Sequence, residues 1–207
     1  MEKNVYAIIL AAGKGTRFHN QKQFLEFHGK PLWRHLYDTL SLVLPKNKII
    51  VVGVDICGGS TRSESVKIGL QWIHDNGICD KVLIMEAARP LVTRKQIEDV
   101  IASNSKSVCF VKPVVDTVIL KNKTYLNRAD CLHLVSPQAF DFKLLYEAYT
   151  NCDLSEIRTD ETRLMNDTYG IKPDFIEGDD NLYKVTYPKD IAIIEEIYKQ
   201  QKENELK

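Results

Sequence analysis

The sequence predicts an α/β fold: a Rossmann-like, doubly wound, mostly parallel sheet with a projecting β-arm. Two observations predict it. Short runs rich in β-branched residues alternate with segments whose apolar residues recur at helical spacing, as is typical of a sheet with helices on both faces. This alternation stops between residues 114 and 134, where two short β runs flank the polar stretch KNKT. We expect a single domain over residues 1–207, with an extended hairpin, the arm, at about 114–134.

Each element is expected where one of two patterns holds. An uninterrupted apolar run indicates a buried strand, and apolar residues three and four positions apart indicate a helix. The expected strands are 5–10, 48–54, 81–85, 107–111, 174–177 and 183–186. The expected helices are 31–44, 63–73, 94–101, 142–149 and 191–203.

Composition argues against several classes of function. Lys plus Arg and Asp plus Glu number 28 each, so the formal net charge is zero, whereas a duplex-binding protein is usually basic overall or along one stripe. No apolar run approaches the roughly 20 residues that a membrane span needs, and the chain opens on a strand rather than a signal peptide. The five cysteines are scattered and form no CxxC pair, which favours reduced thiols. We therefore expect a cytoplasmic protein that binds neither nucleic acid nor membrane.

The first expected strand ends in small residues and cations, in the stretch LAAGKGTRFHNQK. Ligands of an open α/β sheet bind beyond the carboxyl ends of its strands. Small residues there let backbone N–H groups approach a phosphate, and Arg17 and Lys22 supply the charge that a polyphosphate needs. An ordinary glycine-containing turn with solvated cations explains this stretch alone equally well, and it is neither a dinucleotide fingerprint nor a Walker A loop. The small residues are Ala11, Ala12, Gly13 and Gly15.

Three further stretches are expected at the same edge of the sheet. CGGSTRSESVKIGL, residues 57–70, places two glycines before a helix. MEAARPLV, residues 85–92, places an acid and an arginine after the third strand, and GDDNLYKVTYPKDI, residues 178–191, brings in Lys184.

Taken together and in this order, these motifs resemble the cytidylyltransferases that act on 2-C-methyl-D-erythritol 4-phosphate or on D-ribitol 5-phosphate. The resemblance runs from end to end. It implies a fold of the nucleotide-diphospho-sugar transferase type and attack by a polyol phosphate oxygen on the α-phosphorus of CTP. The family's L-A-A-G-x-G-x-R and K-Q are similar to residues 10–17 and 22–23, G-G-x-x-R-x-x-S-V to 58–66, D-A-A-R-P to 86–90, P-V-x-D-T to 113–117, R-x-x-L to 128–132, T-P-Q-x-F to 136–140, T-D to 159–160 and K-[VI]-T-x-P-x-D to 184–190.

The resemblance also implies roles for individual residues. It makes Arg17, Lys22 and Lys184 catalytic, and it makes Arg89, Thr117 and Arg128 the residues that bind the acceptor. It implies Mg²⁺ near Glu86 and a homodimer in which the arm crosses to the second subunit. Without the resemblance, Arg89 could cap a loop, Arg128 could be solvated, and Lys184 could guard an edge strand. The implied nucleotide-binding residues are Ala11, Ala12, Gly13, Gly15, Gly59, Ser60, Arg62, Ser65 and Ala87, with Arg62 supporting the loop that reads cytosine.

Four departures from the family pattern bear on the substrate. Glu86 stands where the family has aspartate, and because Mg²⁺ demands near-ideal geometry, we expect an altered metal preference. The segment between the second strand and Gly58 is short, which predicts a lost sheet element. NLYK predicts a bulge that sets the reach of Lys184, and Gln21 replaces a frequent proline. These departures slightly favour D-ribitol 5-phosphate as the acceptor, for synthesis of a surface glycan. 2-C-methyl-D-erythritol 4-phosphate is expected almost equally.

Two other classes stay open at this point. One is a nucleotidyltransferase with another acceptor, such as a glycerol phosphate or a sugar phosphate. The other is a non-catalytic nucleotide-binding relative, with Glu86 and the short segment as signs of decay. The joint retention of Arg17, Lys22, Arg128 and Lys184 argues against the second class.

Overall fold

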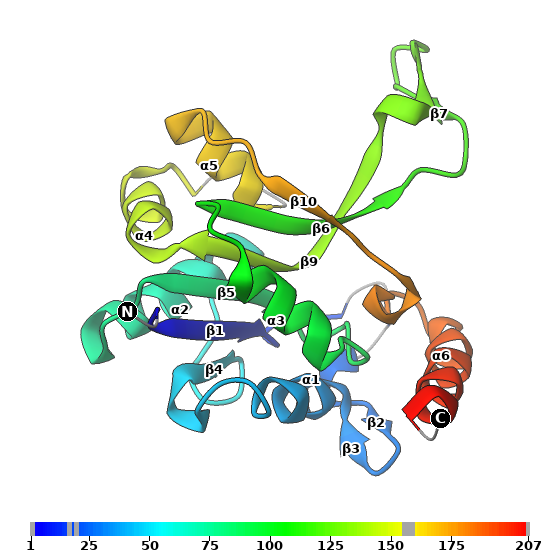
Figure 1. Cartoon of the computed structure of the whole chain (residues 1–207), viewed down its shortest axis with the longest axis horizontal. Helices are drawn as coiled ribbons and strands as arrows, with labels where there is room; N and C mark the ends of the chain where they lie inside the picture. Colours follow the sequence, from blue (N-terminus) through cyan, green and yellow to red (C-terminus); the bar gives the residue numbers. More distant parts are fainter. Residues whose placement is uncertain (1–2, 16–17, 19–20, 155–159, 206–207) are drawn as a thin grey trace.

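The structure, a computed structural model, describes residues 3–15, 18, 21–154 and 160–205 (Figure 1). Within them, a six-stranded sheet has the order β10-β6-β9-β5-β1-β4. β1 pairs in parallel with β4 and β5, and β10 with β6, whereas β9 runs antiparallel to β5 and β6. The predicted, mostly parallel sheet is therefore confirmed. Its strands are β1 (Val5–Leu10), β4 (Ile49–Val52), β5 (Lys81–Glu86), β6 (Ser107–Pro113), β9 (Leu132–Asp141) and β10 (Asp174–Glu177).

Helices cover both faces of the sheet because side chains alternate along each strand. In β1, Val5, Ala7 and Ile9 pack into the cluster that contains α1 and α3. Tyr6 and Ile8 point the other way and pack into the cluster that contains α2, α4 and α5. The doubly wound arrangement is thus confirmed. The helices are α1 (Leu32–Leu40), α2 (Arg62–Asn76), α3 (Arg94–Ala102), α4 (Phe142–Asn151), α5 (Glu161–Tyr169) and α6 (Asp190–Glu205).

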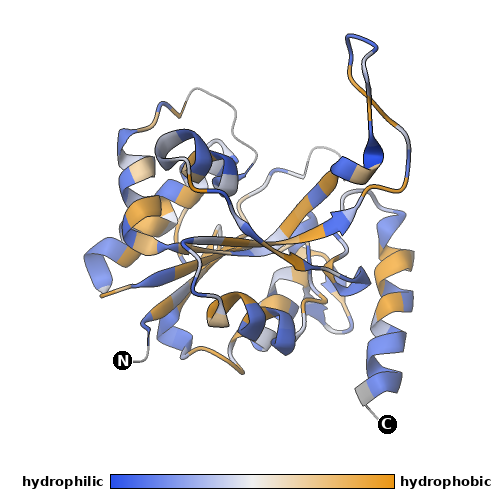
Figure 2. Cartoon of the chain, turned by 45° about the horizontal axis from the view of Figure 1, so that its top comes forward, coloured by the Kyte–Doolittle hydropathy of each residue, from blue (hydrophilic) through white to orange (hydrophobic). Residues whose placement is uncertain are grey.

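The C-terminal helix α6 packs apart from the sheet. Ile194 and Ile197 of α6 join Phe27 of β2 (Glu26–Phe27), which forms a small hairpin with β3 (Lys30–Pro31), and Val185 in one apolar cluster. Figure 2 shows apolar and polar segments alternating along α6, as expected of a helix with one buried face. Because Val185 follows Lys184 directly, this packing anchors the segment that carries one of the predicted catalytic lysines.

The arm projects beyond β6 and β9 (Figure 1). It contains β7 (Val118–Ile119), β8 (Tyr125–Leu126) and the 3-10 turn η3 (Arg128–Asp130), so the predicted hairpin is confirmed, with strands of two residues each. Apolar side chains are exposed along it. The exposed apolar residues of the arm and its base are Val115, Ile119, Leu120, Tyr125, Leu126, Leu132 and Leu134.

Besides the small β2–β3 hairpin, two longer elements were not predicted. β9 contains Ser136 and Gln138, which are buried despite being polar, so its sequence shows no apolar run. α5 is short, and its first turn is capped by Asp160, whose Oδ1 accepts a hydrogen bond from the Thr162 backbone N–H at 2.7 Å. A Gln138 amide hydrogen bond to Asp160 ties the two elements together.

Two predicted elements differ from the structure. The strand expected at 183–186 is wrong: after the 3-10 turn η4 (Asp180–Leu182) the segment makes one backbone hydrogen bond to its neighbour, from Val185 N–H to Ala88 O at 2.8 Å. The same turn replaces the bulge expected from NLYK. α1 ends at Leu40, four residues before the expected end, where the backbone tightens into bonds to the third residue back, from Leu42 N–H to the Thr39 carbonyl at 3.2 Å and from Val43 N–H to the Leu40 carbonyl at 2.9 Å.

The short segment after β4 fits closely against the loop after β1. Gly53 has φ of +103°, and a Cβ there would lie 2.7 Å from the Ala11 carbonyl carbon, so only glycine fits without displacing that loop. Residues 53–61 contain no helix and no ladder strand, only an isolated bridge between Val52 and Ile56. The loss of a sheet element relative to the family stays a prediction. Over the residues that the structure describes, no helix is both long and apolar enough to cross a membrane.

Candidate active site

A cavity of about 370 Å³ opens where β1 and β5 end. It is lined by the loop after β1, the loop that leads into α2, the end of β5 and the segment before α6. The structure thus brings most of the predicted site residues together at the carboxyl edge of the sheet, where α/β folds bind ligands. Of those residues, the lining includes Ala11, Ala12, Gly13, Gly15, Lys22, Gly59, Ser60, Arg62, Ser65, Glu86, Ala87 and Lys184.

Three of the predicted residues that the structure describes do not line this cavity, and a fourth cannot be placed. Arg17 lies outside the described residues. Arg89 is buried beside the cavity and donates a hydrogen bond to the Leu182 carbonyl. Thr117 and Arg128 belong to the arm, where the Arg128 guanidinium donates to the Val115 carbonyl at 2.5 Å. The acceptor-binding roles of these residues stay predictions.

The start of the loop after β1 is held by two hydrogen bonds. The Ala11 backbone N–H donates to the Val52 carbonyl at 2.8 Å. The side-chain amide of Gln23, which is buried, donates to the Gly13 carbonyl at 2.9 Å. Gln23 is a site residue to which the sequence analysis gave no role, although its position in the K-Q motif was the available signal.

Lys22 begins the 3-10 turn η1 (Lys22–Phe24), and its ammonium group donates to the Val185 carbonyl at 2.5 Å. This contact joins the loop after β1 to the segment before α6. It also brings the two predicted catalytic lysines close together at the cavity, since Val185 is the neighbour of Lys184.

The segment that carries Lys184 is held by Asp190 at the start of α6. One carboxylate oxygen of Asp190 accepts hydrogen bonds from the backbone N–H groups of Thr186 and Tyr187, at 2.7 and 2.8 Å. Burial alone would raise the pKa of Asp190, but these hydrogen bonds outweigh it and lower the pKa. Lys184 therefore extends from a fixed backbone.

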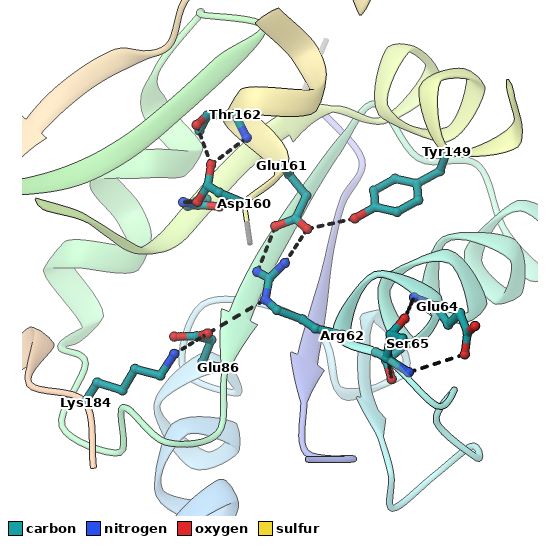
Figure 3. Close-up of polar contacts among 11 residues, drawn as sticks. Arg62, Glu64, Ser65, Glu86, Tyr149, Asp160, Glu161, Thr162 and Lys184 are labelled. Atoms are coloured by element: carbon teal, nitrogen blue, oxygen red, sulfur yellow. Dashed lines mark hydrogen bonds and ion pairs between the residues drawn. The ribbon is translucent and has the colours of Figure 1, made fainter. Parts of the chain in front are cut away.

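The loop that leads into α2 is closed by its own hydrogen bonds (Figure 3). Thr61 and Glu64 form a capping box: the Glu64 N–H donates to Thr61 Oγ1 at 3.1 Å, and the Thr61 N–H donates to the Glu64 carboxylate. The Ser65 hydroxyl accepts from the Gly59 N–H at 3.1 Å and donates to the Thr61 carbonyl at 3.0 Å. This loop keeps its shape through contacts within residues 59–65.

Glu86, at the end of β5, lies among three cations. Its Oε1 lies 2.7 Å from Lys184 Nζ and 3.8 Å from Arg62 Nε, and its Oε2 lies 3.4 Å from Arg89 Nε. Burial alone would raise the pKa of Glu86, but the charges of Lys184, Arg89 and Arg62 outweigh it and hold the pKa at about 2. The Glu86 carboxylate is therefore ionised at any working pH. Because it faces three cations, the group formed by Glu86, Lys184, Arg62 and Arg89 keeps a net positive charge.

The residues present fit a magnesium ion that is held chiefly by phosphate oxygens. Among the described residues, no group of three or more His, Cys, Asp and Glu side chains could hold a metal ion. Glu86 is the one carboxylate among the described residues that line the cavity. Mg²⁺ commonly binds through one or two carboxylates together with substrate phosphates, so Glu86 could contribute one carboxylate to such a site.

Behind the cavity, Arg62 makes a second ion pair that the sequence analysis missed. Its guanidinium contacts both carboxylate oxygens of Glu161, at 2.5 and 2.9 Å, and the Tyr149 hydroxyl donates to the same carboxylate at 2.8 Å (Figure 3). Burial lowers the pKa of Arg62, but the charge of Glu161 outweighs it and raises the pKa. The only signal in the sequence was an acid directly after the T-D motif.

Comparison with known proteins decides the family. The family model described as 2-C-methyl-D-erythritol 4-phosphate cytidylyltransferase matches residues 5–200. A protein of that name from Aquifex aeolicus (strain VF5) is 33% identical over 214 residues, covering 92% of this chain and 96% of the relative. The chain belongs to the 2-C-methyl-D-erythritol 4-phosphate cytidylyltransferase family. A member from Clostridium perfringens (strain SM101 / Type A) is 31% identical over 94% of this chain and 99% of its own length.

Solved structures of family members share the fold. The structure titled 4-diphosphocytidyl-2C-methyl-D-erythritol synthase from Anaerococcus prevotii DSM 20548 superposes with a TM-score of 0.77 at 26% identity, covering 93% of this chain and 97% of that one. The bifunctional IspDF from Campylobacter jejuni gives a TM-score of 0.79 at 29% identity, covering 91% of this chain and 53% of that longer chain. Membership of the family makes this chain a CTP-dependent cytidylyltransferase, which is a nucleotidyltransferase.

Proposed function

We propose that this cytidylyltransferase transfers CMP from CTP to 2-C-methyl-D-erythritol 4-phosphate, for isoprenoid precursor synthesis. The match of that family model to residues 5–200 carries the proposal. The cavity supports it, because two lysines and two loops of small residues meet at one edge of the sheet. On this proposal the whole chain is one catalytic domain, and the arm is part of it.

The chemistry requires positioning and charge rather than a covalent intermediate. A phosphate oxygen of the acceptor attacks the α-phosphorus of CTP, the bond from that phosphorus to the bridging oxygen breaks, and pyrophosphate leaves with the electron pair. Negative charge grows on the phosphoryl oxygens. Lys22 and Lys184 both line the cavity and can stabilise that charge, with Arg17 as a further proposed cation. Mg²⁺, when bound, would neutralise the phosphates.

We propose that cytosine is read by the loop that leads into α2. Gly59, Ser60 and Ser65 line the cavity there, and their backbone is fixed by the hydrogen bonds within the loop. A Cβ at Gly59 would lie 2.3 Å from the Glu64 Cβ, and one at Gly58 would lie 2.1 Å from the Ala12 Cβ. The two loops thus approach each other closely, which favours a narrow slot of fixed depth that admits a pyrimidine and excludes a purine.

D-ribitol 5-phosphate is the second candidate acceptor. It is favoured by Glu86 in place of the family's aspartate and by the short segment at residues 53–61. The two acceptors carry the same reactive group, a phosphate monoester on a polyol, so the same cations serve both.

Pyrophosphate release tests the acceptor. The purified chain is given CTP and Mg²⁺, and each acceptor is offered separately. We expect release with 2-C-methyl-D-erythritol 4-phosphate and at least about tenfold lower kcat/KM with D-ribitol 5-phosphate, since a site built to hydrogen-bond one substrate's hydroxyls discriminates by more than that against a mismatch. Faster release with D-ribitol 5-phosphate would reverse the assignment, and no release with either, in the presence of CTP binding, would contradict the transfer.

We propose that the chain works as a homodimer whose arm reaches the partner's acceptor site. Thr117 and Arg128 do not line the cavity within the single chain, and the arm exposes apolar side chains that a subunit interface would cover. An arginine from the partner could bind the acceptor phosphate with two parallel hydrogen bonds.

Complementation between two inactive variants tests this arrangement. Arg128→Ala and Lys184→Ala are each expected to be nearly inactive. When they are mixed in equal amounts and allowed to exchange subunits, half of the dimers are mixed and each holds one intact site, so activity returns to about a quarter of the wild-type level. Two Lys184→Ala preparations mixed in the same way are the control. No recovery despite proven exchange would show that Arg128 serves its own subunit.

A further inference from the structure

We propose that Glu161 and Tyr149, which lie outside the cavity, are positioning residues for the transfer: they hold Arg62 away from Glu86 and so leave Glu86 to fix Lys184. This inference rests on the proposed function, because its effect is measured on the chemical step. Neither residue is among those that line the cavity.

The contacts form a continuous series across four elements and the segment before α6 (Figure 3). The Tyr149 hydroxyl of α4 donates to Glu161 Oε1 at 2.8 Å, and the Arg62 guanidinium of α2 donates to both Glu161 oxygens. On its other side, Arg62 faces Glu86 at the end of β5, with Nε 3.8 Å from Oε1. That same Oε1 accepts from Lys184 Nζ at 2.7 Å.

Arg62 is therefore placed between two carboxylates, and its geometry favours one of them. It binds Glu161 by two parallel hydrogen bonds, the strongest arrangement for a guanidinium and a carboxylate. Its Nε is buried and makes no hydrogen bond to any described residue. The side chain thus keeps one unused donor directed at Glu86, at a distance slightly too long for a hydrogen bond.

Glu161 is suited to hold this arrangement because it is fixed and fully enclosed. Its exposed fraction is 1%, and it is the first residue of α5. The helix N-terminus favours its negative charge, and Tyr149, also buried, supplies a further hydrogen bond. Burial raises the pKa of Tyr149, and Glu161 raises it further, so this hydroxyl stays a donor.

Removing the charge of Glu161 changes the competition for Glu86. A neutral side chain holds the guanidinium less strongly, and Arg62 can close the remaining gap to Glu86 Oε1. Lys184 then shares that oxygen with Arg62 and loses its fixed place in the cavity. The loop at residues 59–65 is closed by its own hydrogen bonds, so binding of the nucleotide base is affected much less than the placement of Lys184.

The test compares four single variants in the pyrophosphate assay. Glu161→Gln removes the charge and keeps the shape, Glu161→Asp keeps the charge, and Tyr149→Phe removes one hydrogen bond. Leu164→Ala is the matched control, because Leu164 is a buried residue of the same helix that packs in the apolar cluster and takes no part in the series. Melting temperature, kcat and the KM for CTP are measured for each, with the acceptor that the wild type prefers.

We expect Glu161→Gln to lower kcat about 10- to 100-fold, the range for a small displacement of a reacting group, with the KM for CTP changed less than about threefold. Glu161→Asp should recover most of the loss, and Tyr149→Phe should lower kcat a few-fold. Leu164→Ala should lower the melting temperature while kcat stays within about threefold. In an Arg62→Lys background, the loss from Glu161→Gln should shrink, because both residues act through one contact.

Several results would overturn the inference while leaving the proposed function intact. A fully active Glu161→Gln enzyme would do so, as would a loss of kcat that Leu164→Ala reproduces at an equal fall in melting temperature. If Glu161→Gln does not fold, Tyr149→Phe and Glu161→Asp decide. The inference is contradicted if Tyr149→Phe leaves kcat unchanged and Glu161→Asp gives no higher yield of refolded protein than Glu161→Gln. An inactive wild type would instead contradict the proposed function itself.

Discussion

Replacing Lys184 with alanine is expected to lower kcat about 10³-fold, the upper range for removal of one preorganised donor from a developing negative charge. Lys184 lines the cavity on a backbone that Asp190 fixes, so its ammonium group is placed before substrate binds. Its partner Glu86 retains Arg62 and Arg89 in the variant, so the fold should survive. Single-turnover pyrophosphate release measures the effect.

Lys189→Ala is the control for this prediction. Lys189 is exposed five residues further along the same segment, and its removal changes the charge of the chain equally. We expect kcat to stay within about twofold of the wild type. A Lys184→Ala enzyme that keeps more than about a tenth of the wild-type kcat would contradict the catalytic role.

Replacing Glu86 with glutamine is expected to lower the free energy of unfolding by about 3 kcal/mol at pH 7, since its pKa falls from an ordinary 4.5 to about 2 in the folded chain. The sign follows from the direction. A carboxyl whose pKa is depressed on folding stabilises fully above its unfolded pKa, and that stabilisation is lost as the pH falls through the folded pKa. The difference between wild type and variant should therefore be constant from pH 7 to 5 and shrink between about pH 4.5 and 2.

Urea unfolding at a series of pH values measures this difference. Glu98→Gln is the matched control, because Glu98 pairs with Arg94 on an exposed helix surface at 2.7 Å. An exposed pair of that kind contributes about 0.3–0.5 kcal/mol, so its variant should lie close to the wild type at every pH. A Glu86→Gln difference that does not shrink below pH 4.5 would show that the three cations do not hold the carboxylate in its ionised form.

The edge of the sheet at which the site forms could be predicted from sequence because its signals are local. Each strand that supplies the site is a short apolar run, and each run ends in small residues or charges. Strand β1 has the predicted bounds Val5–Leu10, and the lining of the cavity includes both lysines that the motifs singled out among the described residues. The roles of these residues stay predictions until the variants are measured.

There is a physical reason why β9 could not be predicted from the sequence. β9 carries buried polar residues, and a Gln138 hydrogen bond to Asp160 satisfies one of them. Its sequence pattern does not indicate a strand until that partner is known, because burying a polar group without a hydrogen bond costs free energy. The strand expected at 183–186 is absent although its apolar and polar residues alternate. The apolar residues of this segment pack against α6 instead of belonging to a strand of the sheet.

The sequence by itself determined the alternation of strands and helices, the sheet edge that holds the cavity and the cations that gather there. Spacing along the chain encodes these features. Only the tertiary structure decided how the charges pair. Arg62 and Glu161 are 99 positions apart, and Glu86 and Lys184 are 98 apart, so no local pattern joins them. Folding removes these groups from water and leaves each dependent on a partner that another element supplies.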